Sequence, residues 1–283
     1  MKNNGNLKHI SLFFAATAIL TAIFYFSGCI SKEKQDTEIK QSEPSRIPAD
    51  YESLPKPIIV AVIDTGFDFQ SNWKVLLKSY PTLKMPRLCK FGHKDFTGTG
   101  LSDRNGHGTH IAGIIAQQAF NENYCIVVIK YFDPSQNYLS TDNLEQTRKS
   151  FELAINLKVK IINYSGGGEE RSEAECLLIK KALDAGIVVV AAAGNEKNNI
   201  NKNPYYPAMC DSRVRAVANI DRSGQVVPSS NFTDNSPKSR FLYKEMGNQV
   251  LSIIPNNQIG FMTGTSQAAA VETGKVIVSM KKP

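Results

Sequence analysis

The chain has 283 residues, of which 42% are hydrophobic, and its formal net charge is +7 at pH 7. This length allows one or two globular domains, and the composition is ordinary for a protein with a packed core. The basic residues are spread along the chain without a run of five like charges, and no nucleic-acid reader motif is present. These features exclude nucleic acid as an expected partner.

The N-terminal segment predicts export. Lys2 and Lys8 precede an uncharged apolar stretch over residues 10–26, a pattern typical of a secretory signal. The Ser-Gly-Cys sequence ending at Cys29 resembles a bacterial lipobox, in which the cysteine is lipidated and becomes the new N-terminus. We therefore expect a signal peptide over residues 1–28 and a lipid anchor on Cys29. An uncleaved signal anchor and ordinary cleavage are the alternatives, and all three place the chain outside the cytoplasm. With the lipid anchor, we expect it in the cell envelope, either periplasmic or at the cell surface.

Residues 29–54 are polar and carry too few apolar side chains for a core, which predicts a flexible tether. Residues 55–283 are expected to form one domain. Besides Cys29, the chain has four cysteines, which in an exported protein permit two disulfides in any of three pairings; they are Cys89, Cys125, Cys176 and Cys210.

Continuous apolar runs predict buried parallel strands. They cover residues 57–66, 124–132, 159–168 and 186–195, and they are rich in Val and Ile. Helical patterns occupy residues 108–120, 140–157 and 172–186. Two shorter runs, 213–221 and 249–255, precede a last pattern over residues 264–280. This order predicts an α/β fold with a doubly wound, mostly parallel central sheet and helices on both faces.

Polar residues end several of these strands. Asp64 ends the strand predicted in the first run, and Ser165 and Asn195 end the strands predicted in two others. In a doubly wound sheet the functional site lies beyond the carboxyl ends of the strands. The three residues are therefore candidates for a shared site.

The stretch NGHGTHIAG, residues 105–113, holds two of the four histidines, His107 and His110. Zinc-binding helices place their histidines four apart with a Glu between them, and phosphate loops carry a lysine, and neither pattern is present. The third interpretation is a general base, which needs a carboxylate such as Asp64 and a nucleophile such as Ser266. Spacing alone does not show that these side chains meet, and each is also typical of a turn or a cap.

Three blocks, VAVIDTG, GHGTHIAG and GTSQAAA, together resemble the signature blocks of the subtilisin-like serine proteases, the subtilases of peptidase family S8. They occur in the chain order Asp, His, Ser that this family shows. AAAGN and INYSGGG resemble two further blocks, and the resemblance extends over residues 57–280. It implies a subtilisin-like fold and a serine endopeptidase.

The resemblance also implies roles for individual residues. Ser266 matches the nucleophile, His107 the general base, and Asp64 the carboxylate that orients the imidazole. Asn195 matches the oxyanion donor. The segment that pairs with an extended substrate peptide matches Ser165, Gly166 and Gly167, and residues 192–194 match the pocket for the residue before the cut. Their small size suggests an apolar preference, whereas the neighbouring Glu169 and Glu170 favour basic side chains.

Catalysis of this kind needs no cofactor, and we expect a monomer that acts on peptides or proteins. Structural calcium is common in the family, but the sequence does not place its ligands. Gln267 and Ala270 stand where the family usually has Met and Pro, and residues 29–54 are too short for the folding pro-domain of many relatives. These departures leave an alternative, a catalytically weak or inactive lipoprotein that binds peptides or envelope partners. His110 is expected to be a packing residue.

Overall fold

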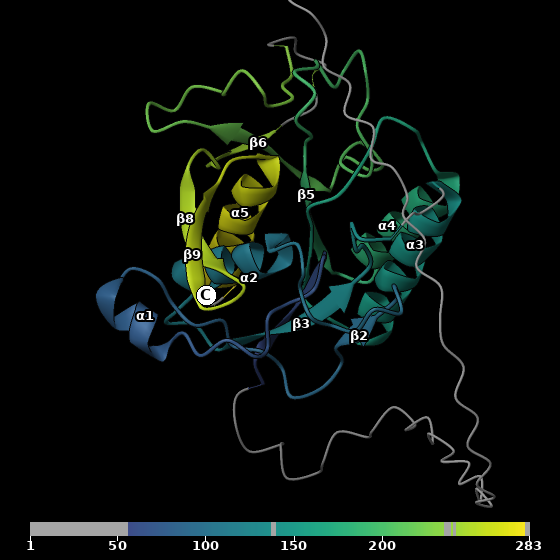
Figure 1. The fold of residues 1–283 in the computed structure, drawn as a ribbon. Coiled ribbons are helices and arrows are strands. Elements are labelled where there is room, and N and C mark those ends of the chain that lie inside the picture. The colour runs from purple at the N-terminus through teal and green to yellow at the C-terminus, as the bar shows by residue number, and fades with distance from the viewer. Residues whose placement is uncertain (1–55, 137–139, 235–238, 240–241, 281–283) are drawn as a thin grey trace, which may run out of the picture. The chain divides into compact units, whose positions relative to one another are not determined.

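The structure of the protein is a computed structural model that describes residues 56–136, 140–234, 239 and 242–280 (Figure 1). The predicted signal peptide, the lipidation of Cys29 and the tether lie outside these residues. Within the described ranges, no helix has both the length and the apolar character needed to cross a bilayer.

Seven parallel strands form the central sheet in the order β2-β3-β1-β4-β5-β6-β7. The four long apolar runs form four adjacent strands in its middle, because strands buried on both faces need uninterrupted apolar sequence. The strands are β1 Ile58–Asp64, β2 Lys94–Asp95, β3 Tyr124–Lys130, β4 Ile161–Tyr164, β5 Val188–Ala192, β6 Arg215–Ile220 and β7 Tyr243–Met246.

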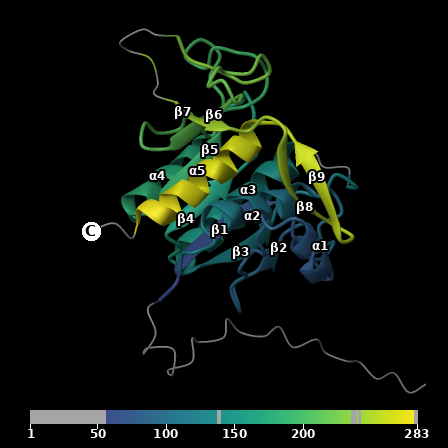
Figure 2. The same ribbon diagram turned by 90° about the vertical axis from the view of Figure 1, so that its left-hand side faces the viewer.

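Helices cover both faces of the sheet. Along β1, Val60 and Val62 pack into the core shared with α2 and α5, while Ala61 and Ile63 pack into the core shared with α3 and α4. Figures 1 and 2 show α2 and α5 side by side on one face. The predicted doubly wound α/β fold is therefore confirmed. The helices are α1 Lys74–Ser79, α2 His107–Gln118, α3 Ser140–Asn156, α4 Glu173–Asp184 and α5 Thr265–Ser279.

A separate antiparallel hairpin packs against α2. It consists of β8 Val250–Ile254 and β9 Gln258–Met262, of which the sequence pattern predicted only the first. Its turn places Asn256 and Asn257 at φ 64° and 57°, a left-handed conformation that asparagine tolerates and that tight hairpins require. The glycine in the middle of β9 and its partly exposed residues explain why no strand pattern was visible.

Two disulfides fasten loops to the sheet and its helices. Cys89 is bonded to Cys125 in β3, and Cys176 in α4 is bonded to Cys210. Of the three pairings that the sequence allowed, the structure has this one.

Candidate active site

The candidate residues gather at one edge of the sheet. Asp64 is the last residue of β1, Ser165 directly follows β4, and Asn195 follows β5. Because β1, β4 and β5 are adjacent and parallel, their carboxyl ends meet at this edge. His107 is the first residue of α2 and Ser266 the second of α5, and these two helices pack against each other.

Asp64 and His107 are joined by a hydrogen bond of 2.7 Å between Asp64 Oδ1 and His107 Nδ1. The carboxylate is 4% exposed and the imidazole 26% exposed. Burial acts to lower the pKa of His107, but the charge of Asp64, its hydrogen bond and the more distant charge of Asp103 raise that pKa above its ordinary value. The pair therefore has the arrangement of a general base held by a carboxylate.

Glycine lets the start of α2 approach the turn after β1. A Cβ on Gly108 would lie 2.3 Å from the carbonyl oxygen of Gly66, so no larger residue fits without moving the backbone. The Gly108 N–H instead donates to Thr65 Oγ1 at 2.9 Å. Gly106, which precedes the helix, has φ 97°, a left-handed conformation that glycine adopts at little cost.

Asp103 is a positioning residue that the sequence analysis missed. It is 3% exposed. Its Oδ1 accepts hydrogen bonds from the Thr65 hydroxyl at 2.9 Å and from the N–H groups of Asn105 and Gly106 at 3.1 and 2.8 Å. Its Oδ2 accepts from the N–H and hydroxyl of Thr109 at 2.8 and 2.7 Å. One carboxylate thus fastens the first turn of α2 to the end of β1. An Asp shortly before a helix start is the signal that could have found it.

Ser266 lies at the start of α5 and is 8% exposed. Its Oγ donates to the backbone carbonyl of Ser165 at 3.1 Å. The side-chain oxygen of Asn195 accepts from the Thr265 N–H at 3.0 Å, which holds the Asn195 amide beside the residue that precedes Ser266. The structure therefore brings Ser165, Asn195 and Ser266 together.

The segment Ser165, Gly166 and Gly167 lies against aromatic side chains. A Cβ on Gly166 would lie 2.1 Å from the Tyr131 hydroxyl, and one on Gly167 would lie 2.5 Å from the Tyr205 ring. The next residue, Gly168, exchanges two backbone hydrogen bonds with Tyr206, of 2.9 and 2.7 Å. Glycine is therefore required for this segment to lie on the tyrosines, with Gly167 exposed to solvent.

His110 serves a different part of the molecule from His107. It is fully buried, and its Nε2 lies 3.1 Å from the carbonyl oxygens of both Val250 and Gly260, one in each strand of the hairpin. Burial lowers the pKa of His110 to about 4, so it is neutral at pH 7. The expected packing role is confirmed. In the described part of the chain, no three or more His, Cys, Asp or Glu side chains are grouped to hold a metal ion.

The two departures from the family pattern are accommodated in the core. Gln267 is 2% exposed, and its amide nitrogen donates to the Met262 sulfur at 3.9 Å. Ala270 is fully buried inside α5, which continues without a break to Ser279. Both residues therefore fit the helix that carries Ser266.

Comparison with known proteins gives consistent matches. The model of the subtilase family, Peptidase_S8, matches residues 56–282. The major intracellular serine protease of Bacillus subtilis (strain 168) is 32% identical over 234 residues, which are 77% of this chain and 67% of that protein. Subtilisin E of the same strain is 30% identical over 232 residues, 79% of this chain and 55% of its own, so the chain spans about half of that relative.

Two solved structures are also similar to this chain. The prenylagaramide maturation protease PagA matches with a TM-score of 0.57 at 25% identity, over 77% of this chain and 72% of that chain. A cold-adapted subtilisin-like serine proteinase matches with a TM-score of 0.61 at 22% identity, over 79% and 75%. The second likeness concerns the fold alone.

Proposed function

Because the chain belongs to the subtilase family of serine proteases, which makes its described domain a serine endopeptidase, we propose that Asp64, His107 and Ser266 are its catalytic residues. The observation that carries this assignment is the hydrogen bond of 2.7 Å between Asp64 and His107, made at the sheet edge where α5 begins and carries Ser266 as its second residue. The Asp64 carboxylate accepts a hydrogen bond from the N–H at Nδ1, which keeps the proton of the neutral imidazole on Nδ1 and leaves Nε2 unprotonated. Nε2 is then free to act as the base.

In the proposed reaction, the Ser266 hydroxyl rotates away from the Ser165 carbonyl, gives its proton to His107 Nε2, and attacks the scissile carbonyl carbon. The tetrahedral intermediate collapses when His107 returns that proton to the leaving amine, which leaves an acyl-enzyme on Ser266. Water, deprotonated by His107, then attacks the ester, and the proton returns to Ser266 as the acid product leaves. The Asn195 amide nitrogen and the Ser266 N–H stabilise the oxyanion.

The substrate is proposed to be an extended peptide that pairs with the backbone of Ser165, Gly166 and Gly167. Backbone pairing accepts many sequences, because it does not depend on side chains. No cofactor takes part in these steps, and the protein is proposed to act as a monomer.

We place the enzyme outside the cytoplasm, anchored by lipid on Cys29 and separated from the membrane by the tether of residues 29–54. The two disulfides support this location, since such bonds persist in oxidising compartments. Lipid analysis of the N-terminal peptide, with a Cys29→Ala control, tests the anchor. Recovery of an unlipidated peptide from wild type would contradict it.

An active-site fluorophosphonate probe tests the catalytic assignment. Wild type should be labelled on Ser266 and should cleave an unfolded protein substrate, and Ser266→Ala should lose both. Asn195→Ala should lower kcat by about 10²–10³ with less effect on KM. A folded wild type that binds peptides without labelling or turnover would instead establish the inactive peptide-binding alternative.

A further inference from the structure

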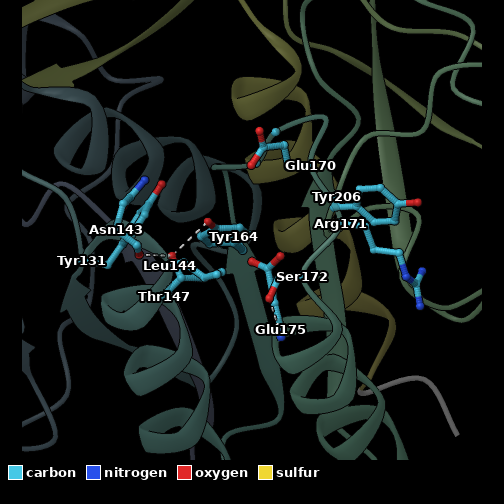
Figure 3. A pocket seen from close by; sticks show the side chains of 12 residues that line it. Tyr131, Asn143, Leu144, Thr147, Tyr164, Glu170, Arg171, Ser172, Glu175 and Tyr206 are labelled. Carbon is cyan, nitrogen blue, oxygen red and sulfur yellow. Dashed lines mark hydrogen bonds between the residues drawn. The ribbon is translucent and has the colours of Figure 1, made fainter. Parts of the chain in front are cut away.

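A pocket opens beside the proposed substrate segment, between the N-terminal ends of α3 and α4 (Figure 3). Its volume is about 440 Å³. Gly167 and Gly168 form one rim, so the pocket begins next to the segment whose first residue, Ser165, contacts Ser266 through its carbonyl. A side chain of a peptide lying along this segment would therefore meet the pocket.

The pocket has a buried carboxylate in its lining. Glu175, in the first turn of α4, is 6% exposed. Its backbone N–H donates to the Ser172 hydroxyl at 3.2 Å, but its carboxylate forms no hydrogen bond or ion pair with any part of the chain that the structure describes. A buried carboxylate without a partner is costly, and the cost is removed by a ligand that brings a positive charge or a donor.

The remaining walls suit a cation. Tyr131, Tyr164 and Tyr206 are among the residues that line the pocket, and aromatic faces attract positive charge. Two cations lie nearby, and both are already engaged. Arg148 donates to Glu145 at 2.7 Å and to Glu152 at 2.6 Å. Arg171 donates from Nε to Glu173 at 2.5 Å, and its guanidinium lies 5.5 Å from the centre of the Tyr206 ring. Neither guanidinium forms an ion pair with Glu175.

The rim adds negative charge. Glu170 lines the pocket and is exposed, so it contributes to the potential at the mouth without closing it. An acidic or purely apolar side chain would leave the Glu175 carboxylate unpaired, whereas a basic one would pair with it inside an aromatic wall.

We propose, on the basis of the proposed peptidase function, that this pocket binds a lysine or arginine side chain of the substrate and that Glu175 determines this specificity. Gly167 lies two residues beyond Ser165, and an extended peptide rises about 3.3 Å per residue. The basic side chain therefore belongs to a substrate residue a few positions away from the scissile bond, not to a residue next to it.

The kinetic test uses internally quenched peptides that carry lysine, norleucine or glutamate at each position within a few residues of the cut. At one position, kcat/KM should be about 10- to 100-fold higher for lysine than for norleucine, the worth of a charge-assisted hydrogen bond. Glu175→Gln, which keeps the shape and removes the charge, should reduce that ratio to near one. Glu170→Gln, a matched loss of charge at the exposed rim, should change the ratio by less than about threefold.

A binding test separates this proposal from the proposed function. The same peptides are titrated into full-length Ser266→Ala protein with and without Glu175→Gln, and the dissociation constants for lysine and norleucine peptides are compared. Absent turnover and absent probe labelling would reject the peptidase assignment, while the binding ratio would still decide the role of the pocket. A wild-type preference for norleucine at every position, or a lysine preference that Glu175→Gln leaves intact, would overturn the proposal.

Discussion

Asp64 and His107 lie 43 residues apart in the chain and share a hydrogen bond of 2.7 Å. The bond and the Asp64 charge favour the protonated imidazole and outweigh the burial that opposes it, so the pKa of His107 is raised above 6.5. The proposed reaction needs the neutral ring. Activity should therefore be present at alkaline pH and fall as the pH drops through this raised pKa, with a midpoint above 6.5.

The pH profile of kcat/KM on a peptide without titrating side chains measures this midpoint. Asp64→Asn should lower kcat by about 10⁴, the size of the effect of the same change in another serine protease, and should move the remaining midpoint to lower pH. A rate that stays flat between pH 5 and 8 would contradict His107 as the base.

Asp103 should matter for activity although it is not proposed to touch substrate. Asp103→Ala leaves five donors without their acceptor, four around the start of α2 and the Thr65 hydroxyl after β1. Unsatisfied buried donors typically cost about 1–3 kcal/mol each before the structure relaxes. We expect a lower free energy of unfolding, measured in urea. Asp103→Asn keeps the shape and should retain more stability, while lowering the pKa of His107 because a negative charge is lost.

The readout for Asp103→Asn is the pH midpoint of activity rather than the rate alone. A purely structural role would reduce activity without moving the midpoint. An unchanged midpoint in a folded Asp103→Asn protein would show that its charge does not reach His107.

Gly108→Ala should disrupt the approach of α2 to β1, because the new Cβ would lie 2.3 Å from the Gly66 oxygen. Overpacking of this kind costs about 1–3 kcal/mol, and any shift moves His107 relative to Asp64. The thermal midpoint and kcat should both fall. Gly168→Ala is the control for stability, since its Cβ would meet no atom within 4 Å; equal losses in the two variants would reject the steric explanation.

The central strands were predictable because they are buried along most of their length and read as continuous apolar runs. The larger helices were predictable because apolar residues recur in them at helical spacing. β7 shows no such apolar pattern, because its residues Tyr243–Met246 alternate between partly and fully exposed. They form a strand only through their pairing with β6. The short α1 and β2 likewise escaped prediction.

Some residues of the site could likewise be predicted from the sequence, and others could not. Asp64, His107 and Ser266 were identified from sequence blocks, but their common location depends on strand order, which no single segment specifies. Glu175 looks in the sequence like an ordinary acidic residue in the first turn of a helix. Its burial in a pocket arises only when α3, β4 and α4 come together, so its unpaired carboxylate could not be predicted.

The disulfides should add to stability by restricting the unfolded chain. Cys89 and Cys125 are 36 residues apart, and Cys176 and Cys210 are 34 apart. Removing a native disulfide typically costs about 2–5 kcal/mol in small secreted domains. Urea unfolding of wild type and of a Cys176→Ser, Cys210→Ser variant measures the loss for the second bond, and a variant as stable as wild type in the absence of reductant would show that this bond contributes nothing.

The buried Glu175 carboxyl should make the stability of the folded protein depend on pH in an unusual way. Burial raises the pKa of this carboxyl from 4.5 to about 7 in the folded protein. Between these values the unfolded chain has lost the proton while the folded protein keeps it. The folded state then binds more protons, and its stability falls as the pH rises from about 4.5 to about 7.

Glu175→Gln removes this ionisation and should therefore stabilise the protein above pH 7, by up to roughly 3 kcal/mol for a shift of this size, while having little effect near pH 4. The neighbouring charges of Glu145, Arg148, Glu170 and Arg171 remain in the variant, and Tyr131 and Tyr164 stay neutral over this range because burial raises their pKa values. The difference between the unfolding curves of variant and wild type at pH 4.5 and pH 8 thus isolates Glu175. If the variant is no more stable than wild type at pH 8, the Glu175 carboxylate has a partner in solution and the pocket does not hold an unpaired charge.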